Sequence, residues 1–309
     1  MFPIIPANSA TAASGNDEGI FWGGYTAGGR ISETNLVSNT GVVSSDVAGT
    51  GTGREQAAGC EYGGDKGIVG YGSGDSGLLS STNLISNTGV ASSDVTGVGT
   101  ARYALSACSY GEDKGIFGYG YAALSMTNLV SNTGVVGTDV TGVGTARQES
   151  AACEYGEDKG IFAFGMSGAN WRDDQVSMSN LVSNTGVVSS DVAGVGTARS
   201  YLAACSYGDD KGIFGYGFGV DGGGGQLKFS MTSLVSNTGV VSSDVTGVGT
   251  ARDGPAATQY GGDKGIFGYG NAGGGYDSMT NLVSDTGVVS SDVTGVGTAR
   301  RRGVACSFN

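Results

Sequence analysis

The chain has 309 residues, and its 28 acidic against 16 basic residues give a net charge of −12. This charge repels phosphate backbones and argues against nucleic acid as a partner, and no apolar run approaches the roughly 18 residues of a membrane span. The chain contains no histidine, which removes Ser-His-Asp and Cys-His catalysis and every histidine-ligated metal site. We therefore expect no enzyme, no cofactor and no metal.

Residues 1–15, MFPIIPANSATAASG, precede the repeats and are expected to form an extended arm. Proline keeps such a segment out of a sheet interior. The segment has no basic residue and too short an apolar core for a secretory signal, so we expect a cytoplasmic location and no membrane insertion unless a resemblance indicates otherwise. The apolar residues Phe2, Ile4 and Ile5 either fold back over the chain's own domain or form an attachment point that docks a neighbouring subunit or a virion partner.

The second expected domain, residues 16–309, consists of six copies of one repeat. Their anchors are Asn35, Asn83, Asn128, Asn180, Ser233 and Asn281, at the Asn of TNL or its equivalent. The distance from an anchor to the Ile of the next KGI motif is always 33 residues, whereas the distance from that Ile to the following anchor varies from 12 to 20 residues. A constant frame with one variable segment indicates a scaffold that displays loops.

Each complete repeat is expected to contain four short antiparallel strands, a to d, joined by turns rich in Gly, Asn and Asp. Typical segments are LAACSYG for strand a (residues 202–208), KGIFGYG for b (211–217), MTNLVSN for c (126–132) and GVVSSDV for d (41–47). Six such units predict an all-β fold, namely a six-bladed β-propeller of four-stranded antiparallel blades.

The N-terminal copy lacks strand a, and the chain ends on one, GVACSFN at Gly303–Asn309. Counted from their anchors, Asn309 takes position 28 of the repeat and Asn16 takes position 29. We therefore expect Gly303–Asn309 to pair with Gly19–Gly23, so that the C-terminal strand a completes the N-terminal blade and closes the ring. An open solenoid would carry distinct polar caps instead.

Cysteines occupy one equivalent position in five repeats, with Thr258 in the sixth. They are Cys60, Cys108, Cys153, Cys205 and Cys306. Facing sheets lie ~10 Å apart, beyond the ~7 Å Cα limit for a disulfide. We expect free, packed thiols, with reactive thiols as the alternative.

Each repeat also carries one equivalent Arg and one equivalent Asp. The arginines are Arg54, Arg102, Arg147, Arg199, Arg252 and Arg300, and the aspartates are Asp46, Asp94, Asp139, Asp191, Asp244 and Asp292. We expect structural pairing that ties the blades together. The alternative is a ring of cations at the mouth of a central channel, where it would bind an anion.

The b–c and d–a connections emerge on one face because strands in a blade alternate in direction, and we name it the loop face. All length variation falls there. Its long loops mix aromatic and charged residues, as interface or sugar contacts do, although freely drifting loops would also vary. The candidate binding residues are Trp171, Arg172, Asp173, Asp174, Phe218, Asp221, Lys228 and Tyr276.

The GIFGYG strand, followed by a loop, a strand and then an Arg before a small strand, resembles kelch repeats, and IFWGGY at Ile20–Tyr25 is nearest to their glycine doublet. In style, the glycine-rich tandem repeats are similar to propeller proteins of marine phage tails and virions. This resemblance implies a virion location, at the tail or surface, and a non-catalytic binding or scaffold module that docks another protein or a host surface glycan, or assembles as a homo-oligomer. The alternatives are a propeller lectin with carbohydrate between blades and an enzyme on a propeller scaffold.

Overall fold

The computed structural model describes residues 17–170, 172–220 and 224–308, and this part of the chain is built from β-strands without a helix. The all-β prediction is therefore confirmed. The expected arm with Phe2, Ile4 and Ile5 lies outside the described residues, as do Trp171 and Asp221.

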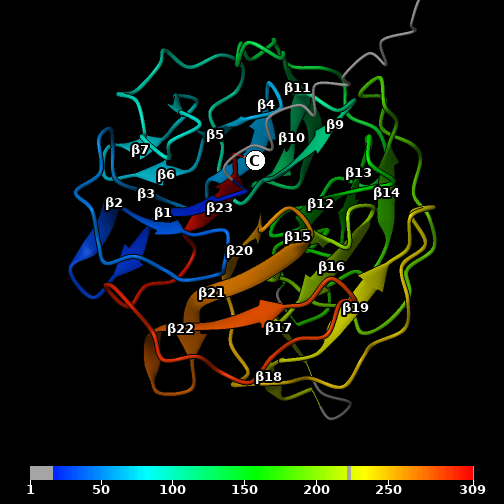
Figure 1. Ribbon diagram of the computed structural model, residues 1–309. Helices are drawn as coiled ribbons and strands as arrows, with labels where there is room; N and C mark the ends of the chain where they lie inside the picture. Colours follow the sequence, from blue (N-terminus) through cyan, green and yellow to red (C-terminus); the bar gives the residue numbers. More distant parts are fainter. Residues whose placement is uncertain (1–16, 171, 221–223, 309) are drawn as a thin grey trace, which may run out of the picture.

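Six antiparallel three-stranded sheets follow one another along the chain, as the repeat predicts (Figure 1). Their strands, given in the order a, b and c, are β23 (Val304–Ser307), β1 (Gly19–Thr26) and β2 (Gly29–Val37); β4 (Ala58–Tyr62), β5 (Lys66–Gly70) and β8 (Thr82–Ile85); β9 (Ser106–Tyr110), β10 (Lys114–Gly120) and β11 (Leu124–Val130); β12 (Ala151–Tyr155), β13 (Lys159–Ala163) and β14 (Ser179–Val182); β15 (Ala203–Tyr207), β16 (Lys211–Gly215) and β19 (Thr232–Val235); and β20 (Ala256–Tyr260), β21 (Lys264–Ala272) and β22 (Gly275–Val283).

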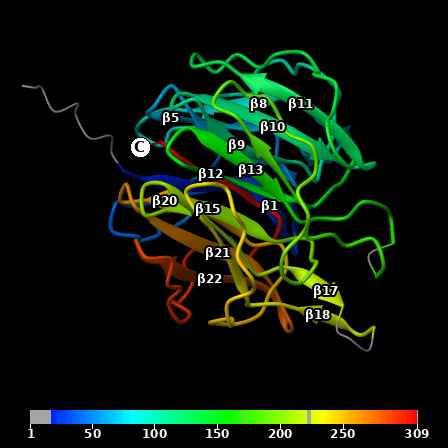
Figure 2. The same cartoon turned by 90° about the vertical axis from the view of Figure 1, so that its right-hand side faces the viewer.

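Short additional strands lie in the d–a and b–c connections. β3 (Arg54–Glu55), β6 (Ser73–Gly74) and β7 (Gly77–Leu78) form one small sheet, and β17 (Phe218–Val220) pairs with β18 (Gln226–Lys228). In Figure 2, β17 and β18 lie at the opposite side of the molecule from the C-terminal end.

Strand b forms the buried middle of each sheet. In β10, for example, Ile116 and Phe117 are fully buried because the strand has β9 and β11 on either side and neighbouring sheets on both faces. Strands with both faces covered read as continuous apolar runs, which is why the KGIF motif lacks alternation. Strand a, in contrast, alternates buried and partly exposed residues in β4, β15 and β20.

The two ends of the described chain meet in one sheet. β1 pairs antiparallel with β23, with Gly19 opposite Ser307 and Trp22 opposite Val304. This confirms the predicted pairing of the C-terminal strand with Gly19–Gly23. The six a-strands also contact one another in succession, β4 with β9, β9 with β12, β12 with β15, β15 with β20, β20 with β23 and β23 with β4.

Backbone hydrogen bonds join the starts of the six a-strands in a closed circuit. The residue two positions before each of these strands has a left-handed backbone, with φ between 53° and 59°. Its N–H donates to the carbonyl of the equivalent residue in the preceding repeat, and the circuit returns from Gln56 to Arg302. The six residues are Gln56, Ala104, Glu149, Tyr201, Gly254 and Arg302. Because each of these residues is hydrogen-bonded to its equivalents in both neighbouring repeats, the backbone at this end of the axis is rigid.

The prediction that segment d forms a regular fourth strand is wrong. Segments such as Gly41–Val47 contact strand c through single bridges, here Val37 with Val43 and Thr34 with Val47. Side chains occupy the intervening ladder positions: Ser44 Oγ accepts the Leu36 N–H at 2.8 Å, and other repeats have the same arrangement. Such side chain–backbone bonds compete with a sheet ladder, so the outer segment follows strand c without forming a strand.

The five cysteines are free and buried, as predicted. Burial raises the pKa of the Cys60 and Cys205 thiols to about 12. Each Sγ faces the glycine of the next repeat's KGI motif. A Cβ built on Gly160, for instance, would lie 2.4 Å from Cys108 Sγ. The glycine and the thiol therefore set the close spacing of neighbouring sheets.

The six equivalent arginines are buried, and each pairs with the aspartate that follows strand c of the sheet whose strand a it precedes, at N–O distances from 2.9 to 4.0 Å. Each guanidinium also lies over an aromatic ring of the preceding sheet, as Arg102 lies over Tyr71 at 4.4 Å from the ring centroid. The predicted structural pairing is confirmed. The alternative of a cation ring at the channel mouth is wrong, because these side chains lie between sheets.

Candidate binding site at the axial mouth

Two residues that follow each buried arginine differ in every repeat. They are Glu55–Gln56, Tyr103–Ala104, Gln148–Glu149, Ser200–Tyr201, Asp253–Gly254 and Arg301–Arg302. The second residue of each pair belongs to the closed backbone circuit, so the six differing pairs lie together around one end of the axis. We name these twelve residues the axial mouth. A rigid and regular backbone thus presents six different pairs of side chains at one place.

Arg302 is the central charge of the axial mouth. Its Nη1 lies 3.6 Å from Glu55 Oε2 and 3.5 Å from Gln56 Oε1, and its guanidinium lies over the Tyr201 ring at 4.7 Å from the centroid. Glu149 accepts a hydrogen bond from Gln56 Nε2. Burial raises the pKa of Glu149 to about 7, although Arg302 and the hydrogen bonds from Gln56 and Tyr201 favour its charged form. The nearby Glu149 charge in turn raises the pKa of Tyr201.

A recess of about 270 Å³ opens beside these residues. It is lined by Tyr201, Phe218, Gln226, Asp253, Arg301 and Arg302. It shares Tyr201 and Arg302 with a smaller axial cavity of about 70 Å³. The volume of the recess, about 270 Å³, lies just below the roughly 300–1,000 Å³ of ordinary small-ligand sites. Its mixture of aromatic surface with a few polar groups is typical of such sites.

Three candidate residues from the sequence gather at this recess. Phe218 lines it, and Lys228 Nζ lies 3.1 Å from Asp253 Oδ2 while donating to the Asn271 and Ala272 carbonyls. Tyr276 lies under the Arg301 guanidinium at 5.2 Å from the centroid.

The candidates Arg172, Asp173 and Asp174 lie in another b–c loop and do not line the recess. The Asp174 carboxylate accepts the Asn170 N–H at 2.7 Å and stabilises its own loop. This loop reaches β17 through Gln175, whose Nε2 donates to the Phe218 carbonyl at 3.0 Å.

Sequence reasoning missed Tyr201, Asp253, Arg301 and Arg302, because the prediction followed loop length and the d–a connection has constant length. It also missed Gln226, which lies in a variable b–c loop beside the candidates Phe218 and Lys228. The sequence did contain a signal for the four residues of the d–a connections: the two residues that follow the equivalent arginine differ in all six repeats, although the segments around them are regular.

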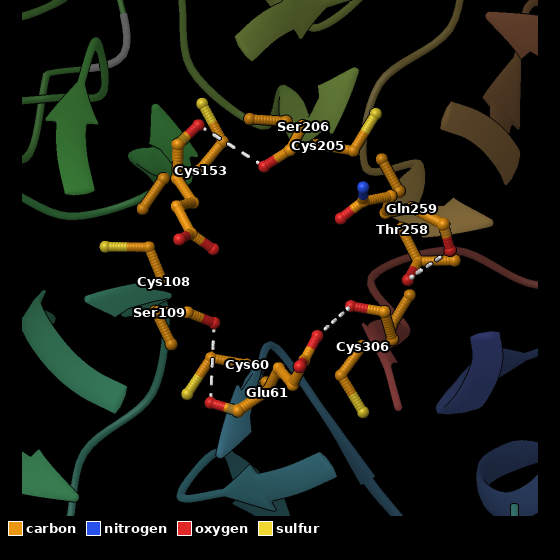
Figure 3. A pocket seen from close by; sticks show the side chains of 18 residues that line it. Cys60, Glu61, Cys108, Ser109, Cys153, Cys205, Ser206, Thr258, Gln259 and Cys306 are labelled. Atoms are coloured by element: carbon orange, nitrogen blue, oxygen red, sulfur yellow. Dashed lines mark hydrogen bonds between the residues drawn. The ribbon is translucent and has the colours of Figure 1, made fainter. Parts of the chain in front are cut away.

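A second group of polar residues lines the axis further along the a-strands. A cavity of about 60 Å³ is surrounded there by the cysteine position and its neighbours, among them Glu61, Ser109 and Gln259 (Figure 3). Ser307 Oγ lies 3.1 Å from Glu61 Oε2 and donates to it. Burial raises the pKa of Glu61 to about 7, and burial together with the Glu61 charge raises that of Glu154 to about 8.

These axial carboxyls predict a pH dependence of stability. Their usual pKa is 4.5, so the folded state binds more protons than the unfolded state between about pH 4.5 and 8, and the free energy of unfolding falls as pH rises through this window. We expect Glu61→Gln with Glu154→Gln to unfold like wild type at pH 4, below this window, and to be more stable at pH 8.5, by at least about 1 kcal/mol after screening by channel water. Thermal unfolding at both pH values measures this. Equal midpoints at pH 8.5 would contradict it.

Among residues 17–170, 172–220 and 224–308, no group of three or more Cys, Asp or Glu side chains is arranged to hold a metal ion. The same residues include no helix that is long and apolar enough to cross a membrane. A comparison with protein-family models gives no match, and a comparison with curated protein sequences gives none either.

Proposed function

We propose that this chain is a six-bladed, kelch-like β-propeller that acts as a non-catalytic binding module. The fold proposal is supported by six successive three-stranded sheets, by a-strands that contact one another in a cycle, and by the circuit of backbone hydrogen bonds at their starts. The pairing of β1 with β23 completes the first blade from both ends of the described chain.

The observation that carries the function is the division of the repeats into regular and differing parts. The groups between sheets, such as the Arg–Asp pairs and the Cys–Gly contacts, recur from blade to blade. The axial mouth differs in every blade. A scaffold needs contacts between sheets that recur from blade to blade, and recognition of one asymmetric ligand needs side chains that differ from blade to blade. The loop face, with the mouth and recess at its centre, is therefore the recognition surface.

The partner is a host surface glycan, and the protein is a virion or tail-associated component that docks it. The recess is small, concave and partly aromatic, which suits a sugar residue better than the flat contact of about 800 Å² per partner in a protein interface. A lectin with one sugar between each pair of blades is less well supported, because its six sites would need equivalent side chains.

The outer rim suits a scaffold within an assembly. Each outer turn presents one valine with 64–66 % of its surface exposed, and these are Val42, Val90, Val135, Val187, Val240 and Val288. Six equivalent apolar residues around the circumference provide repeated sites for lateral contacts with other virion subunits.

A glycan array tests this function. We expect wild type to bind a restricted set of glycans without cleaving them, and Tyr201→Ala with Arg301→Ala to bind at least about tenfold more weakly, as the loss of central contacts implies. The control, Asp65→Ala with Lys66→Ala, changes an a–b turn on the opposite face and should bind like wild type. Equal binding by both variants would place the site elsewhere, and cleavage of a bound glycan would contradict a non-catalytic role.

A further inference from the structure

We propose that the recess at the axial mouth binds a sugar residue that carries a carboxylate, with Arg301 as the group that pairs with it. This inference rests on the proposed glycan-binding function and specifies the chemical class of the sugar. The charged groups at the recess support this inference.

Three of the four charged groups at the recess are already compensated. Asp253 is paired with Lys228 at 3.1 Å, and Arg302 is paired with Glu55 at 3.6 Å. Arg301 lies within ion-pair distance of no carboxylate among the described residues, and its Nε is buried without a hydrogen-bond partner. In a protein of net charge −12, the described part of this concave site thus contains a guanidinium that pairs with none of the described carboxylates. Arginine binds carboxylates through two parallel hydrogen bonds, which makes a carboxylate the matching group.

Arg301 is also held in place before any ligand arrives. Its backbone N–H and carbonyl both pair with Tyr25, at 3.1 and 2.9 Å. Its guanidinium lies over Tyr276, and the Tyr276 ring meets that of Tyr25 edge to face at 6.2 Å between centroids. A side chain fixed in this way loses little conformational entropy on binding.

The rest of the recess matches a sugar ring better than a simple anion. Tyr201 and Phe218 supply aromatic surface for the apolar face of the ring, while Gln226 and Asp253 supply polar atoms for hydroxyl groups.

The test uses an array that includes glycans with uronic or sialic acids, followed by titration of a bound glycan and its carboxyl-reduced form. We expect wild type to prefer the acidic form by at least about tenfold, the usual worth of a charge-assisted hydrogen bond. Arg301→Gln should lose this preference, and Arg301→Lys should retain part of it. Lys159→Gln, which removes the same charge from a turn on the opposite face, should keep it. Wild-type thermal midpoints confirm folding of the variants.

Three outcomes would overturn the inference. The glycans bound by wild type could be neutral or only sulfated, Arg301→Gln could retain the acidic preference, or an array with uronic and sialic acids could show no binding. If a neutral glycan is bound and Tyr201→Ala abolishes its binding, the carboxylate assignment fails while the binding module stands. If no glycan is bound, the glycan-binding function fails as well.

Discussion

Deleting Gly303–Asn309 should abolish cooperative folding, because this segment supplies the innermost strand of the first sheet. Val304, Cys306 and Phe308 are buried, and β23 contacts β4 and β20 in addition to its pairing with β1. Each of these side chains contributes roughly 1.5–3 kcal/mol on burial, and their sum is comparable with the whole stability of a typical domain, about 5–15 kcal/mol. Thermal unfolding followed by circular dichroism should show a midpoint at least about 15 °C lower, or no transition.

A synthetic peptide GVACSFN provides the control for this deletion. Added in excess, it should restore a cooperative transition, because it can occupy the place of β23 without a covalent link, and a scrambled peptide of the same composition should not. A truncated chain that keeps the wild-type midpoint would contradict the closed arrangement that we propose. Size-exclusion chromatography of the truncated chain should show expansion or association through the exposed edge of β1.

The repeat frame made most of the fold predictable. The repeated KGI and TNL motifs locate strands b and c, and the Ile of KGI pairs with the Leu of TNL, as Ile116 does with Leu129, although the segment between the two motifs varies in length. The equivalent cysteines and arginines could be assigned to packing because five or six copies of one residue rarely serve one ligand. The outer segments could not be predicted correctly, because the alternation in GVVSSDV looks like a strand while Ser44 and Asp46 bond back to strand c.

The candidate site was only partly predictable. Phe218, Lys228 and Tyr276 lie in variable b–c loops, so loop length pointed to them. Arg301 and Tyr201 lie in connections of constant length, and nothing local distinguishes their role. They meet because the left-handed residues before the a-strands hydrogen-bond to one another around the axis. Long-range convergence of this kind becomes visible only after the six repeats are placed around a common centre.

Replacement of one buried arginine, Arg54→Met, should destabilise the protein by about 3–5 kcal/mol, since removing one partner leaves buried polar groups uncompensated. Arg54 Nη2 donates to Asn83 and Asp94 at 2.9 Å each, Nη1 donates to the Tyr71 and Ser81 carbonyls, and Nε donates to the Thr52 carbonyl. Arg54→Lys keeps the charge but loses the planar fork, so its free energy of unfolding should fall between those of wild type and Arg54→Met.

The matched control is Lys66→Ala, which removes an ion pair with Asp65 from a side chain that is 42 % exposed and should cost at most about 1 kcal/mol. Urea unfolding of the four proteins measures these differences, and equal costs for Arg54→Met and Lys66→Ala would show that the buried arginine stabilises the fold no more than an exposed ion pair does.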